Sequence, residues 1–418
     1  MNRGIAASGT PSASDPNAAG NSLRERSPER TVAQGGLAAA IPTSLYLHFP
    51  WCVRKCPYCD FNSHALRGEV PEDEYIQALL RDLRFELSDA PITADQRLVS
   101  IFMGGGTPSL FSGRAMGRLL EQMQRQIAFA ADIEITLEAN PGTVDAGHFR
   151  GYRDAGINRL SIGVQSLDAA QLKKLGRIHG PEEALRAYRM AREAGFDNIN
   201  LDLMFALPQQ APAEAMADLD ALIALQPEHI SWYQLTLEAN TEFAARPPPL
   251  PDDDVVAEIF DAGQQRLRNA GYAQYEVSAY ARPGRQARHN LNYWEFGDYL
   301  GLGAGAHGKR SGPWGIERRA RHKHPKRYLE SAGTAGALQE VRRLDPADLP
   351  IEFMLNALRL NAGVPTATWL QRTGLPAETL AAARGRAIGL GLMLADPDRL
   401  QPTALGQRHL NRLLELFL

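Results

Sequence analysis

Cysteine is the scarcest residue type in this 418-residue chain, which contains only three. A small domain stapled by disulfides is therefore excluded. Long apolar runs are also missing, because no stretch reaches the roughly 18 residues that a membrane-spanning helix needs. The N-terminus lacks the apolar segment of a signal peptide, which argues against secretion. We therefore expect a cytoplasmic protein without a membrane-spanning helix.

Neither sign of charge dominates the sequence. Lys and Arg number 45 against 48 Asp and Glu, which gives a formal net charge of −3 and no reason to expect a nucleic-acid partner. Hydrophobic residues make up 44% and charged residues 22%, as is ordinary for a globular protein with a large core. The length fits two or three domains, or one (β/α) barrel with additions.

Residues 1–40 differ from the rest of the chain. They are rich in Gly, Ala, Ser and Pro and show no apolar periodicity, so we expect a disordered N-terminal extension.

From residue 44 onward, short apolar runs alternate with amphipathic helical patterns, which predicts an α/β fold with a parallel sheet. The expected strands are continuous apolar runs, typical of strands covered on both faces; they are Leu45–Phe49, Val99–Met103, Ile133–Glu138, Arg159–Val164, Asn198–Phe205 and Ile230–Leu237. The expected helices between them are 72–88, 113–127, 144–155, 181–194 and 212–225. We expect the sheet to curve into a partial (β/α)6 barrel over residues 41–280.

The remainder of the chain divides into two regions. Residues 281–340 follow a β-type run at Gln274–Tyr280 and contain a glycine-rich segment, Leu300–Gly308. The stretch Lys309–Arg327 then has eight basic residues against one acid, which we interpret as a solvated loop, with an anion site as the alternative. Helical patterns at Ile351–Leu360, Thr366–Arg372 and Ala377–Leu390 predict a small helical domain over 341–418, similar to a winged helix.

All three cysteines, Cys52, Cys56 and Cys59, fall directly after the first expected strand, where a barrel places its active-site loops. Thiolates at this spacing can converge from one tight loop, and their softness selects zinc, copper(I) or an iron–sulfur cluster. A structural zinc ion normally takes a fourth protein ligand, which His48 or His64 would have to supply. Three cysteines on a cubane cluster would leave one iron free for an outside ligand. The spacing alone does not decide whether the three cysteines bind a zinc ion or an iron–sulfur cluster.

Further polar and glycine residues follow the other strand ends. Taken singly, each is an ordinary turn, helix cap or solvated group. At successive strand ends, however, they predict one shared cavity. These residues are Gly104–Pro108 after the second strand, Glu138 and Asn140 after the third, Gln165 at the end of the fourth with Arg177 and His179 beyond it, and Asp202 in the fifth.

The pattern Cys52-x3-Cys56-x-Tyr58-Cys59 resembles the signature of the radical S-adenosylmethionine (SAM) superfamily. The resemblance implies that the three cysteines bind a [4Fe–4S] cluster and that SAM chelates its unique iron. Reduction then cleaves SAM to a 5′-deoxyadenosyl radical, and the protein supplies placement, electrostatics and exclusion of water and oxygen.

The motifs together resemble the oxygen-independent coproporphyrinogen III oxidase-like subfamily, over about residues 43–415. For that subfamily, the SAM-cavity positions correspond to Tyr46, Gly105, Glu138, Gln165, Arg177 and Asp202 in this chain. Tyr58, Gly106 and Thr107 correspond to residues that line the same cavity.

Two features favour the HemW-type haem-chaperone group within this subfamily. True oxidases have a fourth cysteine two residues after the third, where this chain has Phe61. The segment from His289 to Trp294 matches the His-Asn-x-x-Tyr-Trp haem motif of the chaperone group. Imidazole is a haem iron ligand, and Tyr and Trp rings pack on the porphyrin. On its own, His289 would be an ordinary packed histidine; with the resemblance we expect a haem ligand near the cavity mouth.

The resemblance thus implies a haem chaperone without coproporphyrinogen III oxidase activity, with a [4Fe–4S] cluster, SAM and haem as cofactors. Its implied partners are haem-requiring respiratory proteins that accept haem, and an electron donor. Association with the membrane would be peripheral. A second interpretation of the basic stretch 309–327 is that it meets the haem propionates. The alternative function is oxygen-independent coproporphyrinogen III dehydrogenase, in which the radical abstracts hydrogen from substrate propionates. A third interpretation is a zinc-stabilised barrel without this chemistry.

Overall fold

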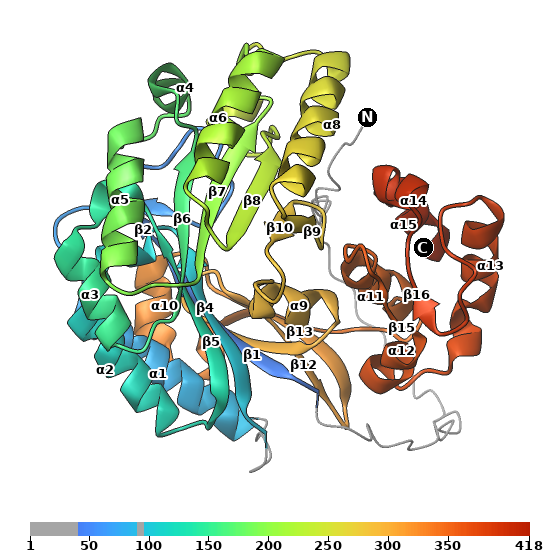
Figure 1. Cartoon of the computed structure of the whole chain (residues 1–418). Helices are drawn as coiled ribbons and strands as arrows, with labels where there is room; N and C mark the ends of the chain where they lie inside the picture. The colour runs from blue at the N-terminus through green and yellow to red at the C-terminus, as the bar shows by residue number, and fades with distance from the viewer. Residues whose placement is uncertain (1–40, 90–95) are drawn as a thin grey trace, which may run out of the picture.

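Seven neighbouring parallel strands form the middle of one twelve-stranded sheet (Figure 1). The computed structural model describes residues 41–89 and 96–418, so the expected disorder of residues 1–40 lies outside the described residues. In spatial order the parallel strands are β11 (Asp298–Leu302), β1 (Thr43–Phe49), β4 (Leu98–Gly105), β5 (Phe129–Ala139), β6 (Arg159–Gln165), β7 (Ile199–Phe205) and β8 (His229–Gln234). The last six are the strands that the sequence predicts, and β11 is an additional one. The two ends of the sheet do not pair with each other among the described residues, so the barrel is open.

Helices follow the parallel strands and cover the outer face of the curved sheet (Figure 1). Several begin at a residue whose side chain accepts a hydrogen bond from the first turn, which satisfies an otherwise unpaired N–H: Ser112 for α2, Asp145 for α3 and Asp168 for α4. Leucines of the strands, such as Leu45, are fully buried between sheet and helices. The helices are α1 (Glu72–Asp89), α2 (Gly113–Gln124), α3 (Ala146–Asp154), α4 (Ala169–Lys174), α5 (Pro181–Glu193), α6 (Pro212–Ala224), α7 (Glu242–Ala245) and α8 (Asp253–Asn269).

The basic stretch 309–327 is not a solvated loop, and the interpretation from sequence is wrong here. Most of it forms the antiparallel strands β12 (His307–Gly312) and β13 (Gly315–Arg321), followed by α10 (Pro325–Ser331). Arg321 is only 1% exposed and forms ion pairs with Asp82 and Glu86 of α1. Lys309 is equally buried and lies 2.7 Å from Asp298. The buried basic residues of this stretch are therefore paired with acids, and for Arg321 these acids lie more than 200 residues away in the sequence.

Short antiparallel strands complete both edges of the sheet. The expected run Gln274–Tyr280 is split by a turn into β9 (Ala273–Gln274) and β10 (Ala279–Ala281), and β10 pairs with β8. At the other edge, β14 (Leu338–Arg343) pairs with β13. A two-stranded pair, β2 (Trp51–Cys52) and β3 (His64–Ala65), frames the cysteine loop. Short 3-10 helices cover Pro108–Leu110, Pro141–Thr143, Ala335–Ala337, Ala377–Leu380 and Glu415–Phe417.

The C-terminal region is helical, as predicted, and lies beside the open side of the barrel (Figure 1). Its hydrophobic core lies around Phe353 and Trp369 and also includes Ala279 of β10 and Ile316 of β13. Its elements are α11 (Leu349–Ala357), β15 (Val364–Pro365), α12 (Thr366–Thr373), α13 (Ala381–Gly389), β16 (Arg399–Leu400), α14 (Ala404–Arg408) and α15 (Leu410–Leu414). The winged-helix comparison and the domain boundaries stay predictions.

One short helix, α9 (Arg288–Trp294), joins these two parts. It contacts β1, β4 and β11 on the barrel side and α11 on the C-terminal side. Leu291 and Trp294 pack against the C-terminal core. In the part of the chain that the structure describes, no helix is long and apolar enough to cross a membrane.

Candidate functional site

A cavity of about 270 Å³ opens at the carboxyl-end side of the parallel strands. Most of the residues predicted for the site line this cavity: Cys52, Cys56, Tyr58, Cys59, Gly105, Gly106, Thr107, Glu138, Asn140, Gln165, Arg177 and Asp202. Tyr46, Gly104, His179 and His289 are not part of its lining. The rule that polar strand ends of a parallel barrel share one cavity therefore holds here.

The cysteine loop presents its three thiols to the cavity. A backbone hydrogen bond of 3.1 Å from the N–H of Cys59 to the carbonyl of Cys56 closes the tight turn. The Thr107 hydroxyl donates to the Cys52 sulfur over 3.3 Å, and a guanidinium nitrogen of Arg177 lies 3.7 Å from the Cys56 sulfur. Burial raises the pKa of Cys52 and of Cys59, so binding of a metal group must displace their protons.

The donor set fits an iron–sulfur cluster better than a zinc ion. Among the described residues, no three His, Cys, Asp or Glu side chains converge closely enough to hold one metal ion, although three thiols face one cavity. A cubane cluster bonds its cysteines to different irons, so its ligands are spread more widely. Both histidines considered for zinc are engaged elsewhere. His48 contacts the Tyr46 hydroxyl and the carbonyl of Asn62, each at 2.8 Å, and His64 contacts Asn62 and Lys323.

Two carboxyl groups, Glu138 and Asp202, line the cavity and both have raised pKa values. Burial and the negative charge of Asp202 raise the pKa of Glu138 to about 8. Asp202 also has a raised pKa because of burial, but it accepts hydrogen bonds from Asn200 at 2.7 Å and Ser161 at 3.2 Å, which oppose that effect. Burial therefore favours the protonated form of both groups, and at neutral pH Glu138 holds a proton. A cationic ligand beside Glu138 would favour release of that proton.

The glycines after β4 are required by the packing of the loop. Gly105 has φ +109°, and a Cβ there would lie 2.5 Å from the His48 ring. The N–H of Gly106 donates to the Phe49 carbonyl over 2.7 Å, and a Cβ at this position would lie 2.6 Å from the Trp51 carbonyl oxygen. Gly105 is the last residue of β4 and Gly106 follows it, and both line the cavity.

Arg177, Gln165 and Tyr233 also line the cavity. One guanidinium nitrogen of Arg177 donates to the Gly163 carbonyl over 2.9 Å, while its buried Nε has no hydrogen-bond partner among the described residues. The Tyr233 hydroxyl donates to Gln165 over 2.6 Å. Sequence reasoning missed Tyr233, although its place near the end of β8 is the same signal that identified the other residues.

Two other polar residues have structural roles. A ring nitrogen of His179, which is 3% exposed, lies 3.1 Å from the Val164 carbonyl. The Asn140 side chain accepts a hydrogen bond from the N–H of Gly142, as a helix cap does, while also lining the cavity.

Tyr46 and His289 lie outside the cavity lining, and both of their rings stack on Phe102. The Tyr46 ring stacks on Phe102 with centroids 5.9 Å apart, and the His289 ring stacks on it at 4.2 Å. His289 is 6% exposed, and its Nδ1 lies 3.2 Å from Glu134. Glu134 and Glu138 are four residues apart on β5, which corresponds to roughly 13 Å along a strand. The expected place of His289 near the cavity mouth is therefore wrong, because α9 approaches the sheet from its amino-terminal side.

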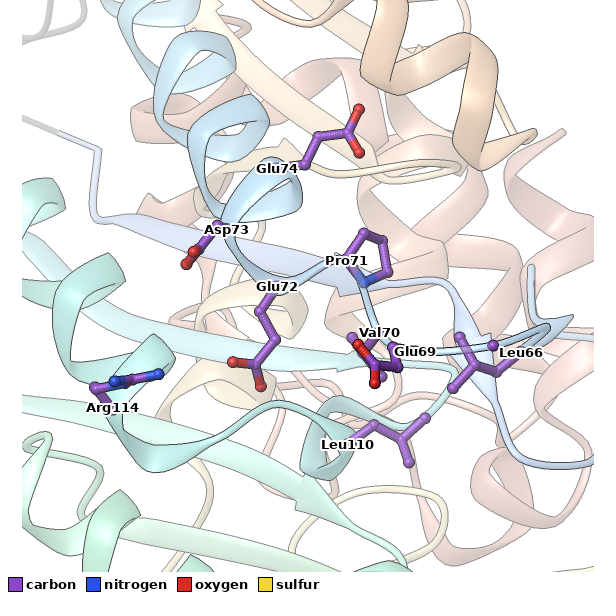
Figure 2. A pocket seen from close by; sticks show the side chains of 10 residues that line it. Leu66, Glu69, Val70, Pro71, Glu72, Asp73, Glu74, Leu110 and Arg114 are labelled. Atoms are coloured by element: carbon purple, nitrogen blue, oxygen red, sulfur yellow. The ribbon is translucent and has the colours of Figure 1, made fainter.

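A larger surface hollow of about 670 Å³ lies at the start of α1 (Figure 2). Acidic residues dominate its lining, but Glu72 accepts a hydrogen bond from the Ser112 hydroxyl over 2.9 Å and so attaches α1 to the start of α2. The hollow contains none of the predicted site residues, and we assign it no part in the site.

Comparisons with known proteins agree with this geometry. The radical SAM superfamily matches residues 46–222, and the HemN C-terminal domain matches residues 344–409. The chain is 51% identical over 378 residues to the heme chaperone HemW of Escherichia coli K12, which covers 90% of this chain and 98% of that protein. It is 38% identical over 343 residues to the mitochondrial radical S-adenosyl methionine domain-containing protein 1 of Mus musculus, covering 80% and 77% of the two chains.

A solved structure extends the similarity to the C-terminal region. Coproporphyrinogen III oxidase (HemN) from Escherichia coli, described as a radical SAM enzyme, superposes with a TM-score of 0.76 at 25% identity and covers 91% of each chain. The open barrel and the three-cysteine loop after its first strand thus define a radical SAM fold and site, a class whose members use a [4Fe–4S] cluster and SAM. Within this class, the chain belongs to the HemW family.

Proposed function

We propose that this protein is a haem chaperone that binds a [4Fe–4S] cluster, SAM and haem, and delivers haem to haem-requiring respiratory proteins. Relatives named as heme chaperones match it along nearly their whole length, which supports the haem part of the proposal. We further propose a cytoplasmic location, an external electron donor and peripheral association with membrane-bound recipients.

The residues around the cavity suit the two radical SAM cofactors. We assign Cys52, Cys56 and Cys59 to the cluster, which supplies the electron for reduction of SAM when it is bound. Glu138 and Asp202 provide carboxylate acceptors for the ammonium and hydroxyl groups of SAM. The buried, unpartnered Nε of Arg177 provides a donor for an anionic or carbonyl oxygen.

Phe61 is the observation that favours the chaperone over the oxidase. It lines the cavity beside Cys59 at the place of the oxidase's fourth cysteine, and its side chain is 58% exposed. A phenyl ring supplies no metal ligand and no proton, so it cannot replace a thiol there. Coproporphyrinogen III dehydrogenase stays the second candidate because of the overall similarity to HemN.

Haem ligation by His289 is part of this proposal and requires a movement of α9. The imidazole packs flat on Phe102, and Trp294 of the same helix stacks with the Arg359 guanidinium at 4.3 Å. A porphyrin can reach the imidazole only when α9 leaves Phe102. The buried residues Lys309, Arg319 and Arg321 are paired with acids, which removes the support for binding of haem propionates by these three.

The test is an anaerobic absorption spectrum after reconstitution with iron and sulfide, followed by addition of haem and, separately, of coproporphyrinogen III with SAM and a reductant. The proposal predicts broad cluster absorbance, a Soret band on haem addition and no vinyl product. Sustained vinyl-product formation would favour the dehydrogenase. Absence of both cluster absorbance and a Soret band would favour the zinc-stabilised barrel.

A further inference from the structure

A chain of side-chain hydrogen bonds runs through the barrel interior from the cavity to α9. Asp202 in the cavity is 2.7 Å from the Asn200 amide nitrogen, and the amide oxygen of Asn200 is 2.6 Å from His229 Nδ1. His229 Nε2 is 2.9 Å from the Tyr275 hydroxyl, which in turn is 3.2 Å from the amide nitrogen of Asn290. Asn200, His229 and Tyr275 are all buried. The chain therefore connects the proposed SAM cavity with the second residue of the haem motif.

We assign one direction to every hydrogen bond in this chain. The Asn200 amide nitrogen donates to Asp202 and also, over 2.8 Å, to the Ser161 hydroxyl oxygen. The amide oxygen then accepts from His229 Nδ1, and the Ser231 hydroxyl donates to the same oxygen over 3.0 Å. Burial and nearby Arg159 hold the pKa of His229 well below its usual range, so the ring is neutral and its Nε2 accepts from Tyr275.

The Tyr275 oxygen also holds the beginning of α9. Besides the amide of Asn290, it accepts a hydrogen bond from the backbone N–H of Ala287, the residue that precedes the helix, over 3.3 Å. All donors thus point toward Asp202, so a negative charge on its carboxylate polarises each bond in turn. A change in the charge at Asp202 alters how firmly Tyr275 holds α9.

We propose that the chain Asp202–Asn200–His229–Tyr275–Asn290 is a coupling relay between the SAM cavity and the haem-motif helix. The coupling itself needs only the described side chains, while its link to haem delivery rests on the proposed function. Two states of α9 are involved: the seated state seen here, with His289 on Phe102, and a released state in which the imidazole is accessible. A cation that engages Asp202 weakens the relay and favours the released state, so the two sites are thermodynamically linked.

A double-mutant cycle tests the relay without SAM or haem. Amide hydrogen exchange of α9 is measured in the full-length protein with its cluster reconstituted, for wild type, Asp202→Asn, Tyr275→Phe and the double variant. Asp202→Asn is expected to accelerate exchange about fivefold, the ratio that separates a charge-assisted from a neutral hydrogen bond. In the Tyr275→Phe background the same substitution is expected to change exchange less than about twofold.

Tyr272→Phe is the matched control. Tyr272 is also buried and donates a hydrogen bond of 2.7 Å, but to the Pro227 carbonyl, outside the relay. In that background Asp202→Asn should keep its fivefold effect. The relay would be overturned if Asp202→Asn changed the exchange of α9 equally in the wild-type, Tyr275→Phe and Tyr272→Phe backgrounds. It would also be overturned if Asp202→Asn had no effect on exchange in any of them. Failure of the proposed function would show separately, as a missing Soret band in the wild type.

Discussion

In the ligand-free protein, the unfolding free energy of Glu138→Gln is expected to rise relative to that of wild type as the pH rises from 5 to 7. The pKa of Glu138 is about 8 in the fold, against an ordinary value of 4.5. Between these values the folded state keeps a proton that the unfolded state has lost. The raised pKa therefore contributes stability below pH 4.5 that is lost as the pH rises toward 8. The Gln variant has no such proton to lose.

The magnitude follows from the linkage slope. Each pH unit inside this window removes about 1.4 kcal/mol from the unfolding free energy of wild type. From pH 5 to pH 7 the variant should therefore gain roughly 2–3 kcal/mol over wild type, which corresponds to a relative rise of about 5 °C in melting temperature. Thermal melts followed by circular dichroism at pH 5, 6 and 7, on protein without cluster or SAM, measure this difference.

Glu134→Gln is the control on the same strand. Hydrogen bonding to His289 and the charge of Arg159 lower the pKa of Glu134 against the effect of burial, so the stability it contributes is present above pH 4.5 and lost only at lower pH. The difference in unfolding free energy between Glu134→Gln and wild type should stay constant between pH 5 and pH 7. If the difference in unfolding free energy between Glu138→Gln and wild type is also independent of pH in this range, the assignment of the proton to Glu138 is refuted.

Three further predictions concern the cluster loop, the haem motif and the glycine turn. Replacing Cys52, Cys56 and Cys59 together with Ala should abolish iron and sulfide incorporation, because the sequence contains no other thiol; retention of both elements after reconstitution would show that the ligand assignment is wrong. His289→Ala should weaken haem binding and shift or flatten the Soret band while the cluster survives, and His322→Ala should leave the haem titration unchanged; identical titrations for all three proteins would remove the motif argument. Gly106→Ala should destabilise the fold by about 1–3 kcal/mol in denaturant titrations because backbone atoms block its Cβ. Gly117→Ala in helix α2 should be neutral or slightly stabilising, because a Cβ there would lie 3.6 Å from its nearest neighbour. Equal losses of unfolding free energy in the two glycine variants would contradict the argument that backbone atoms block a Cβ at Gly106.

Local patterns were sufficient to predict the barrel and the cavity. Continuous apolar runs identified the six strands β1, β4, β5, β6, β7 and β8, because strands covered on both faces leave little ambiguity. The fixed geometry of parallel strands then brings residues as distant as Cys52 and Asp202 to one cavity. Tyr233 obeys the same rule and was missed because its strand reads as apolar.

Long-range pairing explains what the sequence could not show. Arg321 and its partner Asp82 are 239 residues apart, so a stretch that reads as a solvated loop in fact forms strands whose basic side chains pair with acids of α1. The position of His289 depends in the same way on Phe102 and Glu134, which belong to other elements. The motif therefore identified the residue but not its surroundings.

Haem transfer is the most direct test of the chaperone function. The cluster-loaded protein is saturated with haem, freed of excess and mixed anaerobically with the haem-free form of a b-type cytochrome, with haem-loaded serum albumin as the control donor. If this protein is a haem chaperone, the Soret band changes to that of the haem-loaded cytochrome, and the change is faster than with haem-loaded albumin as the donor. The His289→Ala variant should not support this transfer. A Soret band that stays with the donor, or transfer no faster than from albumin, would contradict the account.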